Sequence, residues 1–206
     1  MTIARDERAA LVTTLRAVGP DAPTLCEGWT ARDLTAHMIV REYRPDASPG
    51  ILIPALAGHT KSVQDKAAKD DWDSMIAKFA AGPPLYSPLK PLDRFVNVTE
   101  MFVHHEDVRR AAPGWEPRTL GPAENKAILT PLKAMAKRAI AKSPATVELV
   151  TTEGEQIATG GHGPAVRITG EPLELLLFTF GRAQTRLDFE GDADAVAAVK
   201  AAKRGF

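Results

Sequence analysis

The sequence predicts an α+β protein in which a helical bundle is followed by a small unit of strands and helices. Apolar residues recur at spacings of three and four over most of residues 4–142, which is the period of amphipathic helices. After Ser143 and Pro144 the pattern changes to short, β-rich segments separated by glycine-rich turns. A chain of 206 residues is long enough for two such units. We therefore expect a metal-binding bundle at 1–142, with 122–142 as a linking helix, and a small α+β domain at 143–206.

The first unit is expected to contain five helices, most of them ended by proline or glycine. They cover residues 4–18, 30–43, 60–81, 88–112 and 122–142. Thr30 and Asp33 have the spacing of a capping box, which marks the start of the second helix. Residues 45–58 contain three prolines and two glycines, so they predict a connection with a short helical turn at 51–56.

The second unit is expected to combine four strands with two helices. The strands are predicted at 147–151, 156–159, 165–169 and 185–189, and the helices at 171–181 and 192–203. The first of these helices is apolar almost all round, which is typical of a buried helix. Asp192 is the expected N-cap of the second. The glycine-rich segment 160–164 is not followed by a helix, so it does not indicate a nucleotide-binding loop.

The composition excludes several classes of function. Lysine plus arginine and aspartate plus glutamate each number 26, and this balance argues against nucleic acid or an anionic membrane as the main partner. No apolar run approaches the ~18 residues of a membrane span. The single cysteine excludes a disulfide within the chain. The charged N-terminus lacks the apolar stretch of a secretory signal, so a cytoplasmic protein is expected.

The most informative motif is Glu-x-x-x-His in the helix expected at 88–112. Glu100 and His104 are four residues apart, which puts a carboxylate and an imidazole on one face of that helix. They belong to a polar stripe at helical spacing on an otherwise apolar helix, made of Asp93, Asn97, Glu100, His104 and Asp107. Because a buried carboxylate without a partner is costly, this stripe must face a cation.

His37, in the helix expected at 30–43, offers a third ligand. Together with Glu100 and His104 it would form a facial site for a divalent metal with open positions for water or substrate. The alternatives are an ion pair in the bundle core and a core histidine bonded to a backbone carbonyl. Asp107 lies three residues after His104 and is expected to hydrogen-bond its second ring nitrogen. His105 points ~100° away around the helix and is expected to lie outside the site.

The remaining candidates are weaker. Cys26 lies near a helix N-terminus, which can lower the pKa of a thiol, but such a cysteine is more often a small buried residue and is not expected to act as a nucleophile. His59 is expected at a helix start and His162 in the glycine-rich loop. The basic residues of 122–142 are expected to form a solvated face.

Several of these motifs resemble a known family. The segment LCEGWT at 25–30, with DL at 33–34 and AH at 36–37, is similar to the first signature of the mycothiol-dependent maleylpyruvate isomerase N-terminal family. That family belongs to the DinB/YfiT-like metal-binding four-helix bundles. Its second signature, a Glu-x-x-x-His followed by aspartate, matches residues 100–107. Residues 170–192 resemble the family's smaller sterol-carrier-protein-like α+β domain.

The resemblance implies a divalent metal, usually Zn²⁺, held by His37, Glu100 and His104. It also implies a low-molecular-weight thiol, mycothiol or bacillithiol, whose metal-stabilised thiolate attacks a small electrophilic substrate in an isomerisation or an S-transfer. An arginine of the family's C-terminal domain binds anionic groups, and Arg182 is the matching residue here. Two alternatives stay open, a non-catalytic metal- or ligand-binding protein and a metal-dependent hydrolase with the same triad.

Overall fold

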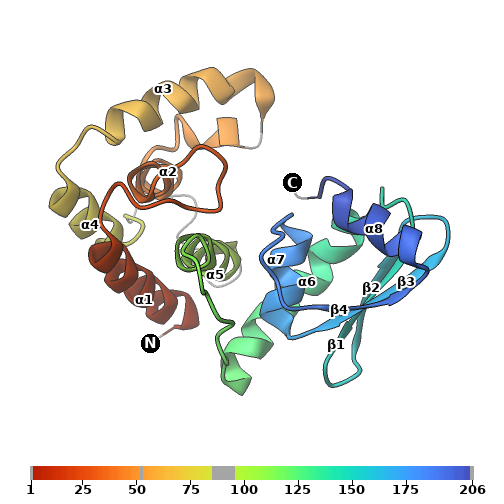
Figure 1. Cartoon of the computed structure of the whole chain (residues 1–206). Helices are drawn as coiled ribbons and strands as arrows, with labels where there is room; N and C mark the ends of the chain where they lie inside the picture. The colour runs from red at the N-terminus through yellow and green to blue at the C-terminus, as the bar shows by residue number, and fades with distance from the viewer. Residues whose placement is uncertain (1, 52, 85–95, 205–206) are drawn as a thin grey trace. The chain divides into compact units, whose positions relative to one another are not determined.

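The chain folds into two compact units, residues 1–115 and 116–206. The computed structural model describes residues 2–51, 53–84 and 96–204 (Figure 1). The first unit is helical and the second combines helices with a four-stranded sheet, so the predicted α+β class is confirmed. Within these described ranges, no helix has both the length and the apolar character needed to cross a membrane.

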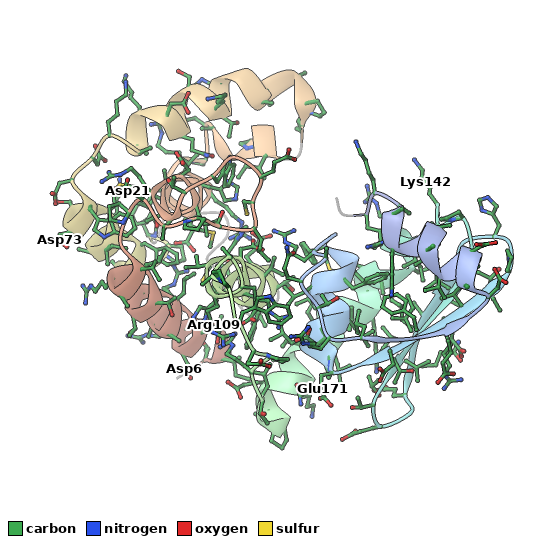
Figure 2. The ribbon with its side chains drawn as sticks, in the orientation of Figure 1. Asp6, Asp21, Asp73, Arg109, Lys142 and Glu171 are labelled. Atoms are coloured by element: carbon green, nitrogen blue, oxygen red, sulfur yellow. The ribbon has the colours of Figure 1, made fainter. Side chains whose placement is uncertain are left out.

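The first unit is a bundle built around one apolar core. Its elements are α1 (Ile3–Val18), α2 (Ala31–Tyr43), the 3-10 turns η1 (Ser48–Ile51) and η2 (Pro54–Leu56), α3 (Ala57–Ala67), α4 (Trp72–Ala81) and α5 (Val96–Arg109). Helix α1 packs against α4 and α5, and α2 packs against α3 and α4. The core includes Leu11, Leu15, Leu34, Met38, Ile76, Phe79 and Met101. The labelled carboxylates Asp6, Asp21 and Asp73 lie on the outside of this unit (Figure 2).

The start of α2 follows the sequence prediction closely. The Thr30 backbone N–H donates to Asp33 Oδ2 at 2.9 Å, and the Asp33 N–H donates to Thr30 Oγ1 at 3.4 Å. This is the predicted capping box, and it satisfies two backbone groups that a helix end leaves open. The box fixes where α2 begins and therefore which of its residues face α5.

The helix expected at 60–81 is instead two helices, so that prediction is wrong. Asp71 caps the new start by accepting a hydrogen bond from the Ser74 N–H at 3.0 Å. Arg32 Nη1 donates to the carbonyls of Ala68 at 3.0 Å and Asp70 at 2.9 Å, which satisfies backbone groups at the break. The expected start of the next helix at residue 88, and Asp93 with it, lie outside the described residues.

The second unit consists of three helices on a mixed sheet (Figure 1). The elements are α6 (Pro122–Ile140), β1 (Thr146–Thr151), β2 (Gln156–Gly160), β3 (Ala165–Gly170), α7 (Pro172–Thr179), β4 (Asp188–Gly191) and α8 (Ala193–Ala201). The strand order is β2-β1-β3-β4, with β1 and β3 parallel and the other pairs antiparallel. Every residue of α7 is buried, and Asp192 caps α8, both as predicted.

Two features of this unit differ from the sequence prediction. Helix α6 was expected as a linking helix of the first domain, but it packs against α7 and β2, where Gly160 leaves room for Ile140. The boundary expected after residue 142 therefore lies inside this unit. The last strand begins at Asp188 and not at Thr185, because the Arg186 N–H donates to the Glu174 carboxylate at 2.7 Å and is not available to the sheet.

Candidate metal centre

Helices α2 and α5 bring the three predicted ligands together. One ligand atom each from His37, Glu100 and His104 lie within 4.8 Å of one another. Glu100 Oε2 is 3.3 Å from His104 Nε2. The imidazole rings of His37 and His104 meet edge-on, with their centroids 5.5 Å apart. Two nitrogens and one carboxylate oxygen are a donor set that suits Zn²⁺ and related divalent ions, with coordination positions left for water or substrate.

Two of the three candidate ligands have the ionisation state that a metal would require. Burial, reinforced by the charges of His104 and Arg41, lowers the pKa of His37 to about 4. Burial alone would raise the pKa of Glu100, but the hydrogen bond from His104 and the charge of Arg41 outweigh it and lower that pKa to about 2. At neutral pH the site therefore offers a neutral imidazole and a carboxylate, which are the forms that bind metal.

His104 is in the opposite state. Burial would lower its pKa, but its hydrogen bonds to Asp107, Cys26 and Glu100 raise the pKa well above the usual value. Without metal the ring is therefore protonated at neutral pH. A metal ion that binds Nε2 must displace that proton.

We expect binding of one divalent ion at pH 7 to release about one proton, from His104. Affinity should rise about tenfold per pH unit below the metal-free pKa of His104 and level off above it. Titration calorimetry in two buffers with different ionisation enthalpies measures the proton count. Binding without proton release would contradict this assignment.

Asp107 holds the far side of the His104 ring. Its Oδ2 is 3.0 Å from His104 Nδ1, and its side chain is fully buried. A proton on Nδ1 that is donated to Asp107 leaves Nε2 free on the side of His37 and Glu100, so the aspartate selects the tautomer and the ring orientation. The three-residue spacing in the sequence is the signal that predicted this contact.

The Asp107→Ala variant is expected to bind metal about 10- to 100-fold more weakly without losing the site. The Asp107→Asn variant keeps an acceptor oxygen of the same shape and should lose less. Competition with a chelator at fixed pH measures both affinities. Equal affinities for the wild type and the alanine variant would show that Asp107 does not orient His104.

Arg41 and Asn97, which the sequence analysis did not single out as site residues, form a polar group beside Glu100. Arg41 Nη1 donates to Asn97 Oδ1 at 2.6 Å, and Arg41 Nε lies 3.6 Å from Glu100 Oε2. Arg41 is four residues after His37 and Asn97 is three before Glu100, so each lies one turn from a candidate ligand. This one-turn spacing is the sequence signal from which Arg41 and Asn97 could have been predicted as neighbours of the site. Both side chains are buried, and Arg41 holds the carboxylate in place.

His105 faces another helix, as the helical period predicts. Its Nδ1 is 2.6 Å from Glu7 Oε1, and its Nε2 is 2.8 Å from Thr14 Oγ1, both on α1. The ring therefore joins α5 to α1 and does not contribute to the candidate site.

A cleft of about 530 Å³ opens beside His37. It is formed by the loop before α2, by η1 and by α3, and its lining includes Trp29, His37, Ile51, Thr60, Lys61 and Gln64. The centroids of the Trp29 and His37 rings are 5.0 Å apart, and Gln64 lines the same cleft. Its volume suits a small molecule, which would contact the candidate site at His37.

Arg182 lies in the second unit, directly after α7. Its backbone N–H donates to Leu177 O at 3.0 Å and its Nη1 donates to Phe180 O at 2.7 Å. Gly181, with a φ of 82°, makes the turn that precedes it. A role for Arg182 at the metal stays a prediction.

The two remaining histidines lie outside the candidate site. His59 is exposed, with its Nε2 3.6 Å from Asp46 Oδ2, and His162 is exposed in its loop.

Comparison with known proteins supports the resemblance at two levels. Residues 1–44 match the family model of the mycothiol maleylpyruvate isomerase N-terminal domain, a segment that includes His37. Two crystal structures of the mycothiol-dependent maleylpyruvate isomerase share the fold. The sequence match is therefore to an N-terminal domain model over these 44 residues, and the structural match is one of fold.

The structural likeness extends over both units. A histidine-to-alanine mutant of that isomerase superposes with a TM-score of 0.61 at 11% identity, covering 91% of this chain and 90% of the other. A second structure of the isomerase gives a TM-score of 0.57 at 12% identity with the same coverage. A search of curated proteins gives no match. The likeness therefore establishes a common fold, and the chemistry must be argued from the site.

Proposed function

We propose that this protein is a metal-dependent enzyme that uses a low-molecular-weight thiol, in the first place mycothiol, to isomerise or conjugate a small electrophilic substrate. The observation that carries the proposal is the convergence of His37, Glu100 and His104 from two helices beside a cleft. A structural zinc site is normally closed by four protein ligands, whereas three leave a position open. The isomerase-like fold and N-terminal signature support the same chemistry.

Each part of the site has a defined task in this proposal. A divalent ion at the triad stabilises a thiolate at neutral pH. Asp107 orients His104, and Arg41 keeps Glu100 ionised and in position. Trp29 provides an apolar wall that excludes water from one side of the cleft.

The proposal is tested by turnover with Zn²⁺, mycothiol and a panel of electrophiles, including cis-configured unsaturated acids. We expect consumption of the electrophile that needs both the metal and the thiol. Glu100→Gln should abolish it, because the amide replaces an anionic ligand with a neutral, weaker one. The matched control is His59→Ala, which removes an exposed imidazole outside the site and should retain full turnover.

Other results would favour the alternative functions. Hydrolysis of ester or amide substrates with metal but without thiol would indicate a metal-dependent hydrolase. Metal binding with no turnover of any substrate would leave a binding protein that keeps the triad.

A further inference from the structure

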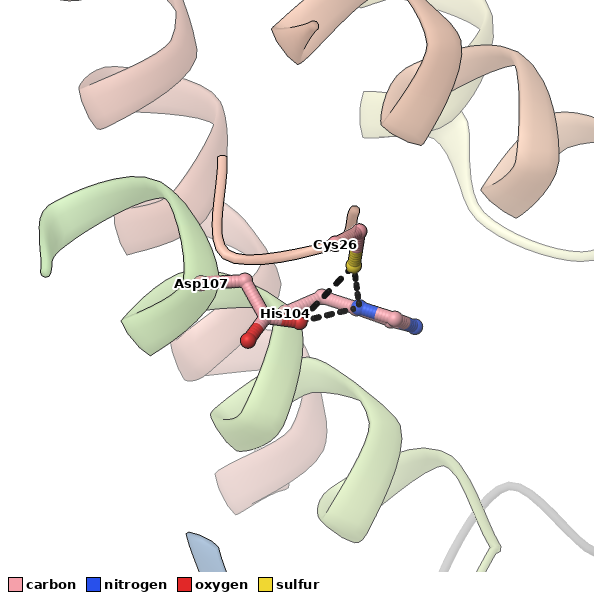
Figure 3. Close-up of side chains that lie close together, drawn as sticks. All are labelled: Cys26, His104 and Asp107. Carbon is pink, nitrogen blue, oxygen red and sulfur yellow. Dashed lines mark hydrogen bonds and ion pairs between the residues drawn. The ribbon is translucent and has the colours of Figure 1, made fainter. Parts of the chain in front are cut away.

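A second group of ligand atoms lies on the opposite side of His104. Cys26 Sγ is 3.2 Å from Asp107 Oδ2 and 4.0 Å from His104 Nδ1, and Asp107 Oδ2 is 3.0 Å from that nitrogen (Figure 3). Ligands around a tetrahedral ion, at ~2.3 Å for sulfur and ~2.0 Å for nitrogen or oxygen, would be ~3.3 to ~3.6 Å apart. The three measured distances all come within about 0.5 Å of that range.

The loop that carries Cys26 is fixed to α5 by its backbone. The Leu25 N–H donates to the Asp107 carbonyl at 2.9 Å, which joins the loop to the same turn of the helix. Thr24 Oγ1 accepts from the Cys26 N–H at 3.2 Å and donates to Trp29 O at 2.9 Å. The thiol is therefore held beside Asp107 and His104 before any ligand arrives, which lowers the entropy cost of binding.

We propose that Cys26, His104 and Asp107 form a second metal site, selective for soft divalent ions such as Zn²⁺, Co²⁺ and Cd²⁺. A thiolate and a carboxylate together carry two negative charges, which match the charge of the ion, and the thiolate selects soft ions over Mg²⁺ or Ca²⁺. Binding displaces the thiol proton and the proton on Nδ1, and both pass to solvent.

The two sites share one imidazole through different nitrogens. His104 Nε2 lies on the side of Glu100, and Nδ1 lies on the side of Cys26 and Asp107. With one ion bound at the triad, Asp107 would accept a hydrogen bond from His104 Nδ1–H and orient the ring. With both sites filled, His104 would lose both ring protons to solvent and would contribute Nε2 to one site and Nδ1 to the other. The second site goes beyond the proposed thiol chemistry and depends only on this chain's own side chains.

Cobalt titration of thiol-free, anaerobic protein tests the inference. We expect two Co²⁺ ions per chain and a near-ultraviolet thiolate-to-cobalt charge-transfer band. Cys26→Ser should abolish the band and keep one ion, whereas His37→Ala should keep the band and also bind one ion. Circular dichroism checks that each variant is folded, and Glu100→Gln replaces His37→Ala if that variant does not fold.

The outcomes separate this inference from the proposed function. A wild-type protein that binds one Co²⁺ without a thiolate band at saturation overturns the second site and leaves the triad in place. Loss of the thiolate band in both His37→Ala and Glu100→Gln also overturns the second site, because thiolate binding would then depend on the triad. If the thiolate band forms but His37→Ala binds as much cobalt as the wild type, the result would instead count against the triad.

Discussion

His37→Ala is expected to remove most of the zinc bound at the triad. Glu100 and His104 would then supply only two protein donors, too few to hold a divalent ion against dialysis. The comparison is made in a Cys26→Ser background, so that a thiolate cannot retain metal, and zinc is measured by elemental analysis. Full retention of zinc would refute the assignment of His37 as a ligand.

His105→Ala is the control for helical phase, since it removes the neighbouring imidazole. It should leave the metal content unchanged but lower the free energy of unfolding by about 1–3 kcal/mol, because the hydrogen bonds of His105 with Glu7 and Thr14 would be lost. Thermal and denaturant unfolding measure that cost. Loss of metal in His105→Ala together with retention in His104→Ala would show that the assigned helical phase is one residue out.

Mycothiol is expected to change the visible spectrum of the cobalt-loaded protein, and Arg182→Ala is expected to weaken that response. An open coordination position lets a thiolate reach the ion, and a guanidinium stabilises an anionic thiolate or substrate. Loss of one charge-assisted hydrogen bond corresponds to an affinity about 10- to 100-fold lower. A titration of mycothiol followed by absorbance measures it, with Cys26→Ser as the background.

Arg182→Lys separates charge from local structure, because it keeps the cation but not the planar donor group. Partial recovery of mycothiol affinity would support a charge effect, and unfolding measurements would show whether the turn after α7 is disturbed. An unchanged affinity in Arg182→Ala removes Arg182 from the site. A spectrum that does not change at saturating mycothiol, with cobalt bound, rules out the thiol enzyme and leaves a metal-binding protein.

The sequence predicted most elements because their signals are local. The capping box of Thr30 and Asp33 and the all-apolar α7 depend on neighbouring residues only, and both appear where expected. The break between α3 and α4 was missed, since Arg32, far away in the chain, satisfies the backbone there. The position of α6 was missed for a similar reason. An amphipathic pattern shows which face is buried but not which partner covers it.

The candidate site divides in the same way. The helical period by itself placed Glu100, His104 and Asp107 along one stripe of α5 and His105 on another, because residues three and four apart in a helix are neighbours. Only the tertiary structure brought His37 across from α2 and put Cys26 against Asp107, 81 residues away in sequence. Such distances depend on how helices and loops pack, which no local spacing encodes.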